Sequence, residues 1–455
     1  MRDILVFLLI FGSIPFIIRR PYIGVLVWSW IGYMNPHRLA FGFAVNFPFA
    51  AVIGVVTVIS MVFAKDIKWF PKHPTNIVLI LFIIWMGISC TQALSPEFAW
   101  DSYKRVIKIQ MMVFITMMLL QSRERIHQLI WVIAASIGYF GIKGGIFTIL
   151  TKGEFMVLGP EGGFFEGNTE IGLIILMILP LFYYLHQTST NRWIRIGLVV
   201  SMVLMAIAAI GTHSRGALVA AAGLLGFFWL KSNTKMITGL AGIVLAAALY
   251  YFMPPSWHEK MLTIINYQQD PSAMGRINAW WTAFHISNDR LFGGGFEFWS
   301  PETFLIYAPN PLDFHDAHSI YFEVLGEHGY IGLLLYLLYG LLAFFTASKI
   351  IKQTQNLEYF AWANLLARMI QVSLIAYATG GSFLGLAYAD IGYQLVAILV
   401  LLQYLVNQGV SEQQADSENQ IENLDDSQPF VRKPVSAKVG SGVSTPKKDA
   451  GRYVR

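Results

Sequence analysis

The sequence predicts an all-α, polytopic integral membrane protein with about twelve transmembrane helices, between eleven and thirteen, and one large loop outside the membrane. Three observations predict this fold class. Hydrophobic residues make up 55% of the chain and charged residues only 13%, whereas soluble domains carry about 25% charge. The apolar residues also gather in long runs, as membrane-spanning helices of about 20 residues require.

Thirteen apolar runs follow one another along the chain, separated by polar or turn-forming residues. The first two are short and could form one hairpin or one re-entrant element, so we expect about twelve spans. The runs are Ile4–Ile18, Tyr22–Met34, Phe47–Phe63, Ile77–Ala93, Val106–Leu120, Ile126–Leu150, Ile171–Leu185, Ile194–Ile210, Ala217–Leu230, Met236–Phe252, Ile320–Thr346, Tyr359–Ala378 and Leu384–Val406.

The distribution of lysine and arginine predicts the orientation, because cytoplasmic loops of membrane proteins carry an excess of both. One set of alternate loops is rich in these residues, and we place it in the cytoplasm. The set is Arg19, Arg20, Lys65, Lys68, Lys72, Arg123, Arg125, Arg192, Arg195, Lys231, Lys235, Lys349 and Lys352. The loop 254–317 then lies on the periplasmic side. The net charge of +5 follows from such loops and is no evidence for a nucleic-acid partner.

A second group of cations lies on the opposite side, where the charge bias does not expect them. These residues are Arg38, Lys104, Arg105, Lys108, Lys143, Lys152, Arg215, Lys260, Arg276 and Arg290. Their position predicts an anionic ligand on that side. The alternative is that single residues among them anchor the chain to lipid headgroups.

Composition divides the chain into four parts. We expect N-terminal transmembrane helices in residues 1–253, a periplasmic loop with an amphipathic helix in 254–317, C-terminal transmembrane helices in 318–406 and a disordered cytoplasmic tail in 407–455. The tail is too polar to bury a core of its own. The single cysteine, Cys90, excludes a disulfide framework and a multi-cysteine metal site.

Two arginines are candidates for an anion site. Arg215 lies in THSRGAL between two apolar runs, and a charge at membrane depth costs at least about 2.5–3.5 kcal/mol. A lipid pyrophosphate would offset that cost, because a guanidinium donates two parallel hydrogen bonds to phosphate. The alternative is an arginine that reaches the headgroups from a helix end.

Arg276 lies in MGRINAWWTAF, where the spacing of apolar residues predicts an amphipathic helix on the membrane surface. The apolar positions are Ile277, Trp280, Trp281 and Phe284. A solvated arginine on the polar face of that helix is the alternative to an anion ligand. The spacing alone does not choose between the two.

His318 is the candidate base. It stands where the chain re-enters apolar sequence, with Asp316 placed to cap the following helix and Tyr321 expected on the same helix face. A neutral imidazole there could accept the proton of a sugar hydroxyl, which contributes about 10²–10⁴-fold to a rate. An interfacial histidine without a catalytic part is the alternative.

Two further arrangements involve charged side chains. A metal site is one interpretation of His315 and His318, with Asp313 nearby. No HExxH motif is present, and we predict no metal. Arg368 and Asp390 lie within apolar sequence, and we expect them to form a structural ion pair between the last two spans. The glycine cluster Gly293–Gly295 lacks a nucleotide-loop pattern and predicts close packing of the backbone.

Four runs between Phe164 and Tyr339 stand in an order that resembles a known family. They are FFEGNTEIGLIILMILPLFYYL, THSRGALVAAAGLLGFFWL, RINAWWTAFHISNDRLFGGGFEFW and HSIYFEVLGEHGYIGLLLYL. Together they resemble motifs of the bacterial O-antigen ligase superfamily, which includes O-antigen polymerases and protein O-oligosaccharyltransferases. Ser319 stands where that family commonly has asparagine. The N-terminal part is similar to a subgroup of O-glycosylation ligases, which leaves the acceptor more open than the donor.

The resemblance implies a GT-C-like fold and a glycosyltransferase of the bacterial inner membrane, with its active site facing the periplasm. Arg215 and Arg276 would bind the pyrophosphate of an undecaprenyl-linked glycan, and His318 would accept the proton of the acceptor hydroxyl or orient it. Arg105 and Lys108, on the same side, are additional candidates for the phosphate site, and Tyr321 is a further site candidate. The family is thought to need no metal or nucleotide cofactor.

The sequence is therefore interpreted as an O-antigen ligase. It would transfer a glycan from undecaprenyl pyrophosphate to a hydroxyl of lipid A–core by an inverting, metal-independent attack, with the membrane and these two substrates as its partners. An O-antigen polymerase or a protein O-glycosylation ligase is the alternative with the same chemistry. A lipid or polysaccharide transporter is the alternative from another class, but it should show internal repeats, and none is apparent.

Overall fold

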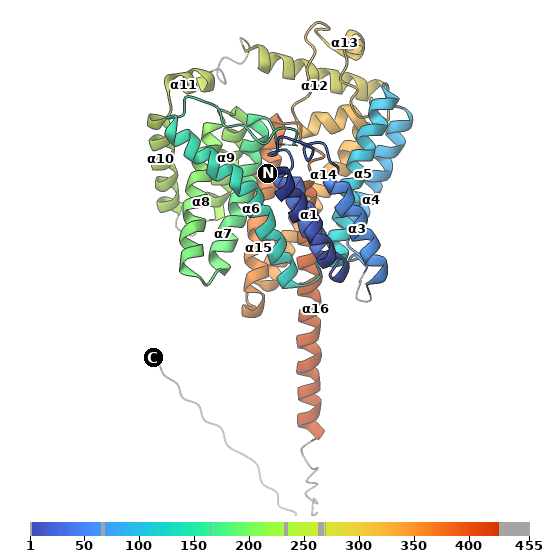
Figure 1. Cartoon of the computed structure of the whole chain (residues 1–455), viewed down its shortest axis with the longest axis vertical. Helices are drawn as coiled ribbons and strands as arrows, with labels where there is room; N and C mark the ends of the chain where they lie inside the picture. The colour runs from blue at the N-terminus through green and yellow to red at the C-terminus, as the bar shows by residue number, and fades with distance from the viewer. Residues whose placement is uncertain are drawn as a thin grey trace, which may run out of the picture. The chain divides into compact units, whose positions relative to one another are not determined.

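Helices make up almost all the regular structure of this computed structural model, which describes residues 2–64, 69–163, 165–231, 235–262, 268 and 270–426. Within those ranges no β-strand occurs, which confirms the all-α prediction (Figure 1). Met1–Asn407 form one compact unit and Gln408–Arg455 a second, and every candidate site residue belongs to the first. Lys65, Lys68 and residues 427–455 of the predicted tail lie outside the described ranges.

The helices and the short 3-10 turns η2 and η3 follow one another along the chain. In order they are α1 (Arg2–Arg19), α2 (Tyr22–Met34), α3 (Phe49–Phe63), α4 (Pro74–Thr91), α5 (Pro96–Leu119), α6 (Arg123–Leu150), α7 (Asn168–Thr188), α8 (Arg192–Gly211), α9 (Arg215–Lys231), α10 (Lys235–Phe252), α11 (Pro255–Leu262), α12 (Pro271–Asp289), α13 (Pro301–Tyr307), α14 (Ile320–Thr354), η2 (Glu358–Phe360), α15 (Ala361–Gly380), η3 (Gly381–Phe383) and α16 (Asp390–Asp426). Helix α16 thus extends through residues 407–426, the first part of the predicted tail.

Local sequence explains where several helices begin. Ser122 Oγ accepts a hydrogen bond from Arg125 N–H (3.4 Å) at the start of α6, and Asn191 Oδ1 accepts one from Trp193 N–H (2.8 Å) at the start of α8. Proline occupies the first turn of α4, α5, α12 and α13, where a helix has no use for its missing N–H. Polar caps and prolines therefore place the helix starts.

Seven described helices or helix pairs are long and apolar enough to cross a membrane. They are Pro74–Thr91, Arg123–Leu150, Asn168–Thr188, Arg192–Gly211, Ile320–Thr354, Glu358–Phe383 and Asp390–Gln414. Three shorter apolar helices accompany them: Tyr22–Met34, Phe49–Phe63 and Arg215–Leu230. The total of about twelve spans stays a prediction.

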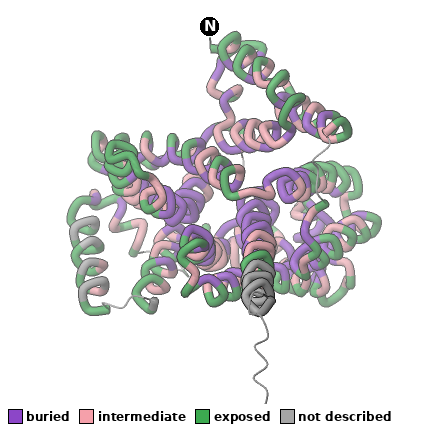
Figure 2. The backbone as a smooth tube through the Cα atoms, turned by 90° about the horizontal axis from the view of Figure 1, so that it is seen from below, coloured by how far each residue is buried: buried purple, intermediate pink, exposed green. Residues whose placement is uncertain are grey.

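Burial supports a membrane environment. Buried segments gather toward the middle of the helical bundle, whereas the outer helices are largely exposed (Figure 2). Many exposed side chains are large and apolar, among them Leu8, Trp193 and Val203. A surface of this kind is stable against lipid tails, whereas in water it would promote aggregation. Together with the apolar helices, this is the architecture of a multi-pass membrane protein.

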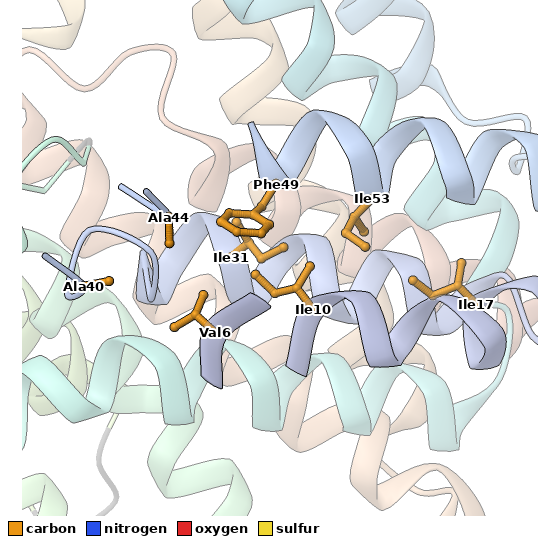
Figure 3. Close-up of a cluster of buried hydrophobic side chains, with 8 residues drawn as sticks. All are labelled: Val6, Ile10, Ile17, Ile31, Ala40, Ala44, Phe49 and Ile53. Carbon is orange, nitrogen blue, oxygen red and sulfur yellow. The ribbon is translucent and has the colours of Figure 1, made fainter. Parts of the chain in front are cut away.

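The first three helices share a small core of their own. Val6, Ile10 and Ile17 of α1 lie against side chains of α2 and α3 (Figure 3). The other members are Ile31, Ala40, Ala44, Phe49 and Ile53. This cluster ties together α1 and α2, the two short runs for which the sequence left a hairpin or a re-entrant element open.

Helix α12 lies across one end of the bundle, and α11 and α13 lie at the same end (Figure 1). It packs on α14 and buries small residues such as Gly275, Ala279 and Ala283. Trp281 and Phe284 stay exposed, at 49% and 39%. Small residues therefore let the backbones of α12 and α14 come close, and the aromatic side remains available to a membrane surface.

Helix α14 is interrupted at Gly329, whose backbone has φ 66° and ψ −172°. The glycine cluster lies against this break. Gly294 N–H donates to the Gly326 carbonyl (2.8 Å), and Gly295 N–H donates to the Glu327 carbonyl (2.9 Å). The close backbone packing expected of the glycine cluster is thus present, and it satisfies carbonyl groups that the break leaves without helical partners.

Helix α4 holds the other side of the same break. Trp85 Nε1–H donates to the His328 carbonyl (2.8 Å), and Ser89 Oγ lies 2.7 Å from His328 Nδ1. The His328 side chain is completely buried. These contacts make His328 part of the protein interior.

The expected ion pair between Arg368 and Asp390 is wrong. Arg368 is exposed and its Nε donates to Asn364 Oδ1 (2.7 Å), whereas Asp390 is 6% exposed at the start of α16. The reason is the length of α15. From Arg368 to the end of that helix at Gly380 the chain rises by about 18 Å, at 1.5 Å per residue, and Asp390 lies beyond that end, at the start of α16.

The contact between α6 and α8 gives a test of the fold. A Cβ on Gly145 would lie 2.1 Å from the Leu204 carbonyl oxygen, whereas Gly197 of α8 has open space. Gly145→Ala should destabilise the protein by about 1–3 kcal/mol through overpacking. Gly197→Ala should leave stability unchanged or raise it, since alanine favours helix. The thermal midpoint of each purified variant in detergent checks this; equal midpoints would contradict the packing of these helices.

Candidate functional site

The first site element is an ion pair between the beginnings of two helices. Asp270 caps α12, because its Oδ1 accepts hydrogen bonds from Ser272 N–H (2.9 Å) and Ala273 N–H (3.3 Å). Its Oδ2 accepts from Nη1 of Arg215, the first residue of α9. Both side chains are mostly buried, at 19% exposure for Arg215 and 12% for Asp270. One carboxylate therefore fixes α12 and holds the guanidinium of Arg215.

Arg215 and Arg276, the two candidate anion ligands, line one groove of about 240 Å³. The rest of its wall is small or apolar: Gly216, Val219, Ala273, Ile277, Trp280 and Phe383. Arg276 Nε is buried and makes no hydrogen bond within the described part of the chain. Burial and, after it, the charge of Arg215 lower the pKa of Arg276, against the opposing effect of Asp270 and Glu170. Two partly desolvated guanidinium groups side by side favour an anion.

His318 lies just before α14, in the left-handed backbone region with φ 42°. Trp280 holds this segment, since its indole N–H donates to the Ala317 carbonyl (2.7 Å) and its ring stacks on Phe322 at 4.9 Å. Burial and then Arg276 lower the pKa of His318 from its ordinary value of 6.5, while Asp316 and Glu170 oppose the shift. The imidazole is therefore neutral at pH 7 and able to accept a proton.

His318 faces a cavity of about 710 Å³. Its walls come from α2, α3, α5, α7, α14, the start of α16 and the loops beside them. The charged side chains that line it, besides His318, are Arg105, Glu170, Glu297, Asp316, Glu323, Glu327 and Asp390. The groove and the cavity adjoin, because Trp280 belongs to the groove and bonds to Ala317, which belongs to the cavity.

Two acidic residues of the cavity are tied to the surrounding backbone and side chains. Glu327 Oε2 accepts from the Tyr388 hydroxyl (2.6 Å), and its Oε1 accepts from Glu297 N–H (3.1 Å). Glu297 Oε1 accepts from Ser102 Oγ–H (3.1 Å) and from Arg105 Nη2–H (3.2 Å). The cation of Arg105 is thus paired inside the cavity.

The three additional site candidates lie apart from the two arginines of the groove. Arg105 lines the cavity with His318, and Lys108 is exposed and lines neither space. Tyr321 donates its hydroxyl proton to the Ala378 carbonyl (2.8 Å) and lines a different, mainly apolar pocket between α14, α15 and α16. In this structure Arg105 and Lys108 do not extend the arginine groove.

Two expectations about the start of α14 are wrong. Asp316 does not cap the helix: the cap position is Ser319, and its side chain makes no cap bond. Tyr321 does not share a helix face with His318, because the helix begins at Ile320 and His318 has a left-handed backbone. The spacing rule for helix faces holds only when both residues are helical.

Sequence reasoning missed Asp270, Glu170 and the carboxylates deeper in the cavity. Asp270 had a detectable signal, since an aspartate directly before a proline is a typical start of a helix. Glu170 lies in the first turn of α7, and its charge acts on both Arg276 and His318. It stands in the run FFEGNTE, but nothing in that run shows which distant residues it meets.

Two family models match the chain. Residues 1–190 match a family of unknown function (DUF5935), and residues 200–337 match the O-antigen ligase family. Residues 200–337 are thus similar to the O-antigen ligase family, and this segment is called the O-antigen ligase domain below. The suspected relationship to the O-antigen ligase superfamily is therefore confirmed. No curated protein matches the sequence.

The O-antigen ligase domain contains Arg215, Arg276 and His318, and with them Asp270. The cavity is completed from outside that domain. Glu170 comes from the segment that matches the family of unknown function, and Asp390 from the C-terminal part of the chain. The site thus assembles three separate stretches of sequence.

Removal of the Asp270 charge tests the first site element. Asp270→Asn keeps an oxygen that can cap α12 but leaves two neighbouring guanidinium groups without that anion, so it should destabilise the protein by about 1.5–3 kcal/mol, the range for hydrogen bonds to charged groups. Asp101→Asn is the matched control, because its pair with Lys104 is exposed and such pairs contribute about 0–1 kcal/mol. The thermal midpoint of each purified variant measures its loss of stability. Equal losses in the two variants would contradict a larger structural contribution of Asp270.

Proposed function

We propose that this protein is a membrane glycosyltransferase of the O-antigen ligase type, which moves a glycan from undecaprenyl pyrophosphate to an acceptor hydroxyl. The observation that carries the proposal is the placement of Arg215 and Arg276 in one groove, with the neutral imidazole of His318 in the adjoining cavity. An anion site beside a base is the arrangement that glycosyl transfer from a pyrophosphate needs.

The groove suits the donor. The two guanidinium groups would bind the pyrophosphate, and the apolar side chains of Val219, Ile277 and Phe383 would contact the first part of the lipid. Because pyrophosphate is already a good leaving group, the site mainly needs cations where negative charge grows. The proposed reaction therefore uses no metal and no nucleotide. Among the described residues, no three metal-binding side chains are grouped together.

The reaction is a single in-line displacement. The oxygen of the acceptor hydroxyl attacks the anomeric carbon, and the bond from that carbon to the pyrophosphate oxygen breaks as the new glycosidic bond forms. The hydroxyl proton passes to His318. The electron pair of the broken bond leaves with undecaprenyl pyrophosphate, where Arg215 and Arg276 stabilise it. Attack from the face opposite the leaving group inverts the anomeric configuration.

The proposed acceptor is a lipid A–core saccharide, and the proposed location is the bacterial inner membrane with the site open to the periplasm. The O-antigen ligase domain supports this choice. Transfer to a second lipid-linked glycan or to a protein would use the same step and the same residues. A transporter is less well supported, because Arg215, Asp270 and Arg276 lie together at the end of the bundle that α12 covers (Figure 1).

The proposal is tested by an in vitro reaction of the purified protein with an undecaprenyl-pyrophosphate-linked glycan and, in separate reactions, lipid A–core, a second donor glycan or a pilin-like protein. Product formation with one acceptor and not the others identifies the reaction. Addition of EDTA should leave the rate unchanged. Absence of transfer to every acceptor, with donor and protein intact, would contradict the proposal.

Substitution of His318 should remove the base. His318→Ala should lower transfer by about 10²–10⁴-fold and retain donor binding. In the unsubstituted protein kcat/KM should stay level as pH falls through 6.5 and decline only below it, since the reactive neutral form persists down to the lowered pKa of His318. His285→Ala, on α12 and bound to the Tyr307 carbonyl, is the control. Normal transfer by His318→Ala would refute the assignment.

Substitution of the two arginines should act on the donor. Arg215→Ala and Arg276→Ala should each weaken donor binding by about tenfold or more, because a charge-assisted hydrogen bond contributes about 1.5–3 kcal/mol and 1.4 kcal/mol is a tenfold change. Arg368→Ala is the matched control, since that arginine is exposed, donates to Asn364 Oδ1 and does not line the groove. Donor affinity is measured with a labelled lipid. Unchanged affinity in both groove variants would show that Arg215 and Arg276 do not bind the pyrophosphate.

A further inference from the structure

The segment 1–190, which matches the family of unknown function, lines only one of the two spaces of the site. Among the described residues, none from this segment lines the groove that holds Arg215 and Arg276. In contrast, half of the residues that line the cavity with His318 belong to it. Because the groove is the proposed donor site, this division associates the segment with the other substrate, the acceptor.

Helix α2 is central to this part of the cavity wall. Its Trp28 packs against the core that α1, α2 and α3 share, and it also lines the cavity. Gly32 lies one turn further along α2, and Asn35 follows directly after the helix; both line the cavity as well. Asn35 has a left-handed backbone with φ 47°, and its N–H donates to the Ile31 carbonyl (3.1 Å). The core of the first three helices therefore fixes the position of these residues.

The loop before α7 is fitted to the same helix. Gly163 in this loop lines the cavity beside Asn35, and a Cβ on Gly163 would lie 2.5 Å from Asn35 Nδ2. A larger residue at Gly163 would therefore displace the amide. Phe165 of the loop stacks on Tyr33 of α2, with 6.4 Å between the ring centroids. The loop and α2 both belong to the segment 1–190, so this segment builds its side of the cavity by itself.

Trp28 and Asn35 have the chemistry of a sugar-binding site. The indole ring of Trp28 is a flat apolar surface with an electron-rich face, against which the C–H groups of a pyranose ring can pack. Within the described part of the chain, neither the indole N–H of Trp28 nor the side-chain amide of Asn35 makes a hydrogen bond. Both groups line the cavity and can bond to a ligand. An apolar wall with a few polar groups is typical of pockets for organic ligands.

We propose that the segment 1–190 is the acceptor-recognition part of this enzyme, with Trp28 and Asn35 as specificity-determining residues. Trp28 stacks on a sugar ring of the acceptor, and Asn35 bonds to a hydroxyl of the same molecule. This inference rests on the proposed transfer reaction, and it gives a role to the segment of unknown function. Residues 200–337 then supply the two arginines and the base, and residues 1–190 select the molecule that receives the glycan.

The test measures the affinity for each substrate separately, with the full chain in lipid nanodiscs. One titration uses the core oligosaccharide released from lipid A–core, and the other uses a labelled undecaprenyl-pyrophosphate-linked glycan. Trp28→Ala should weaken binding of the oligosaccharide by about tenfold, because a stacking surface is lost. Asn35→Gly should weaken it by about three- to tenfold, because a hydrogen bond is lost. Both variants should keep the donor affinity of the unsubstituted protein.

The substitutions are chosen to separate recognition from folding. Glycine replaces Asn35 because it accepts the left-handed backbone, and Trp28→Phe should recover part of the affinity because its ring still stacks. Trp30→Ala is the matched control. Trp30 packs against the same core of α1, α2 and α3 but does not line the cavity, so this variant should bind both ligands normally. If Trp28→Ala fails to fold, Trp28→Phe and Asn35→Gly complete the test.

Loss of oligosaccharide affinity in the Trp28 and Asn35 variants, with donor affinity and the Trp30 control unchanged, supports the inference. Four results overturn it: unchanged oligosaccharide affinity in these variants, an equal loss of donor affinity, an equal loss in Trp30→Ala, or no binding of the oligosaccharide by the unsubstituted protein. Failure of the proposed transfer reaction is seen separately, as absence of product with every acceptor, because neither titration contains both substrates.

Discussion

The ion pair between Asp270 and Arg215 is the constraint on which the site depends. A single carboxylate caps α12 and binds the first residue of α9, so the two helices cannot move independently at this point. It also offsets the repulsion between Arg215 and Arg276, which share one groove. The direction of α12 determines where Trp280 lies. Trp280 in turn donates a hydrogen bond to the Ala317 carbonyl, and this bond positions the neighbouring His318. Capping, charge compensation and the position of the proposed base are thus consequences of one interaction.

The connection between groove and cavity is the second organising feature. The groove holds the guanidinium groups of Arg215 and Arg276, and the cavity holds His318. Trp280 lines the groove and donates its indole N–H to the Ala317 carbonyl, which belongs to the cavity. Glu170 lines the cavity, and its charge acts on both Arg276 and His318. A change on one side of this connection is therefore felt on the other.

Sequence patterns predicted the features that depend on local chemistry. Hydropathy found the helices, and the unusual positions of Arg215, Arg276 and His318 identified them as candidates. Features that depend on convergence in space were missed. Glu170 is an ordinary polar residue before an apolar run, and Asp390 lies within one; only the folded chain brings both into the cavity. Tyr321 was misplaced because a helix rule was applied across the left-handed residue His318. Arg368 and Asp390 were paired because sequence shows apolar surroundings and not the distance along α15.

The break of α14 at Gly329 has a consequence for how substrates are selected. Carbonyl groups exposed by the break receive hydrogen bonds from Gly294 and Gly295 on one side and from Trp85 on the other. Glu327, two residues before the break, accepts hydrogen bonds from the Tyr388 hydroxyl and from Glu297 N–H. This part of the cavity wall is consequently preorganised. A rigid wall does not reshape itself around an incoming molecule, so discrimination among acceptors arises from complementarity that exists before binding.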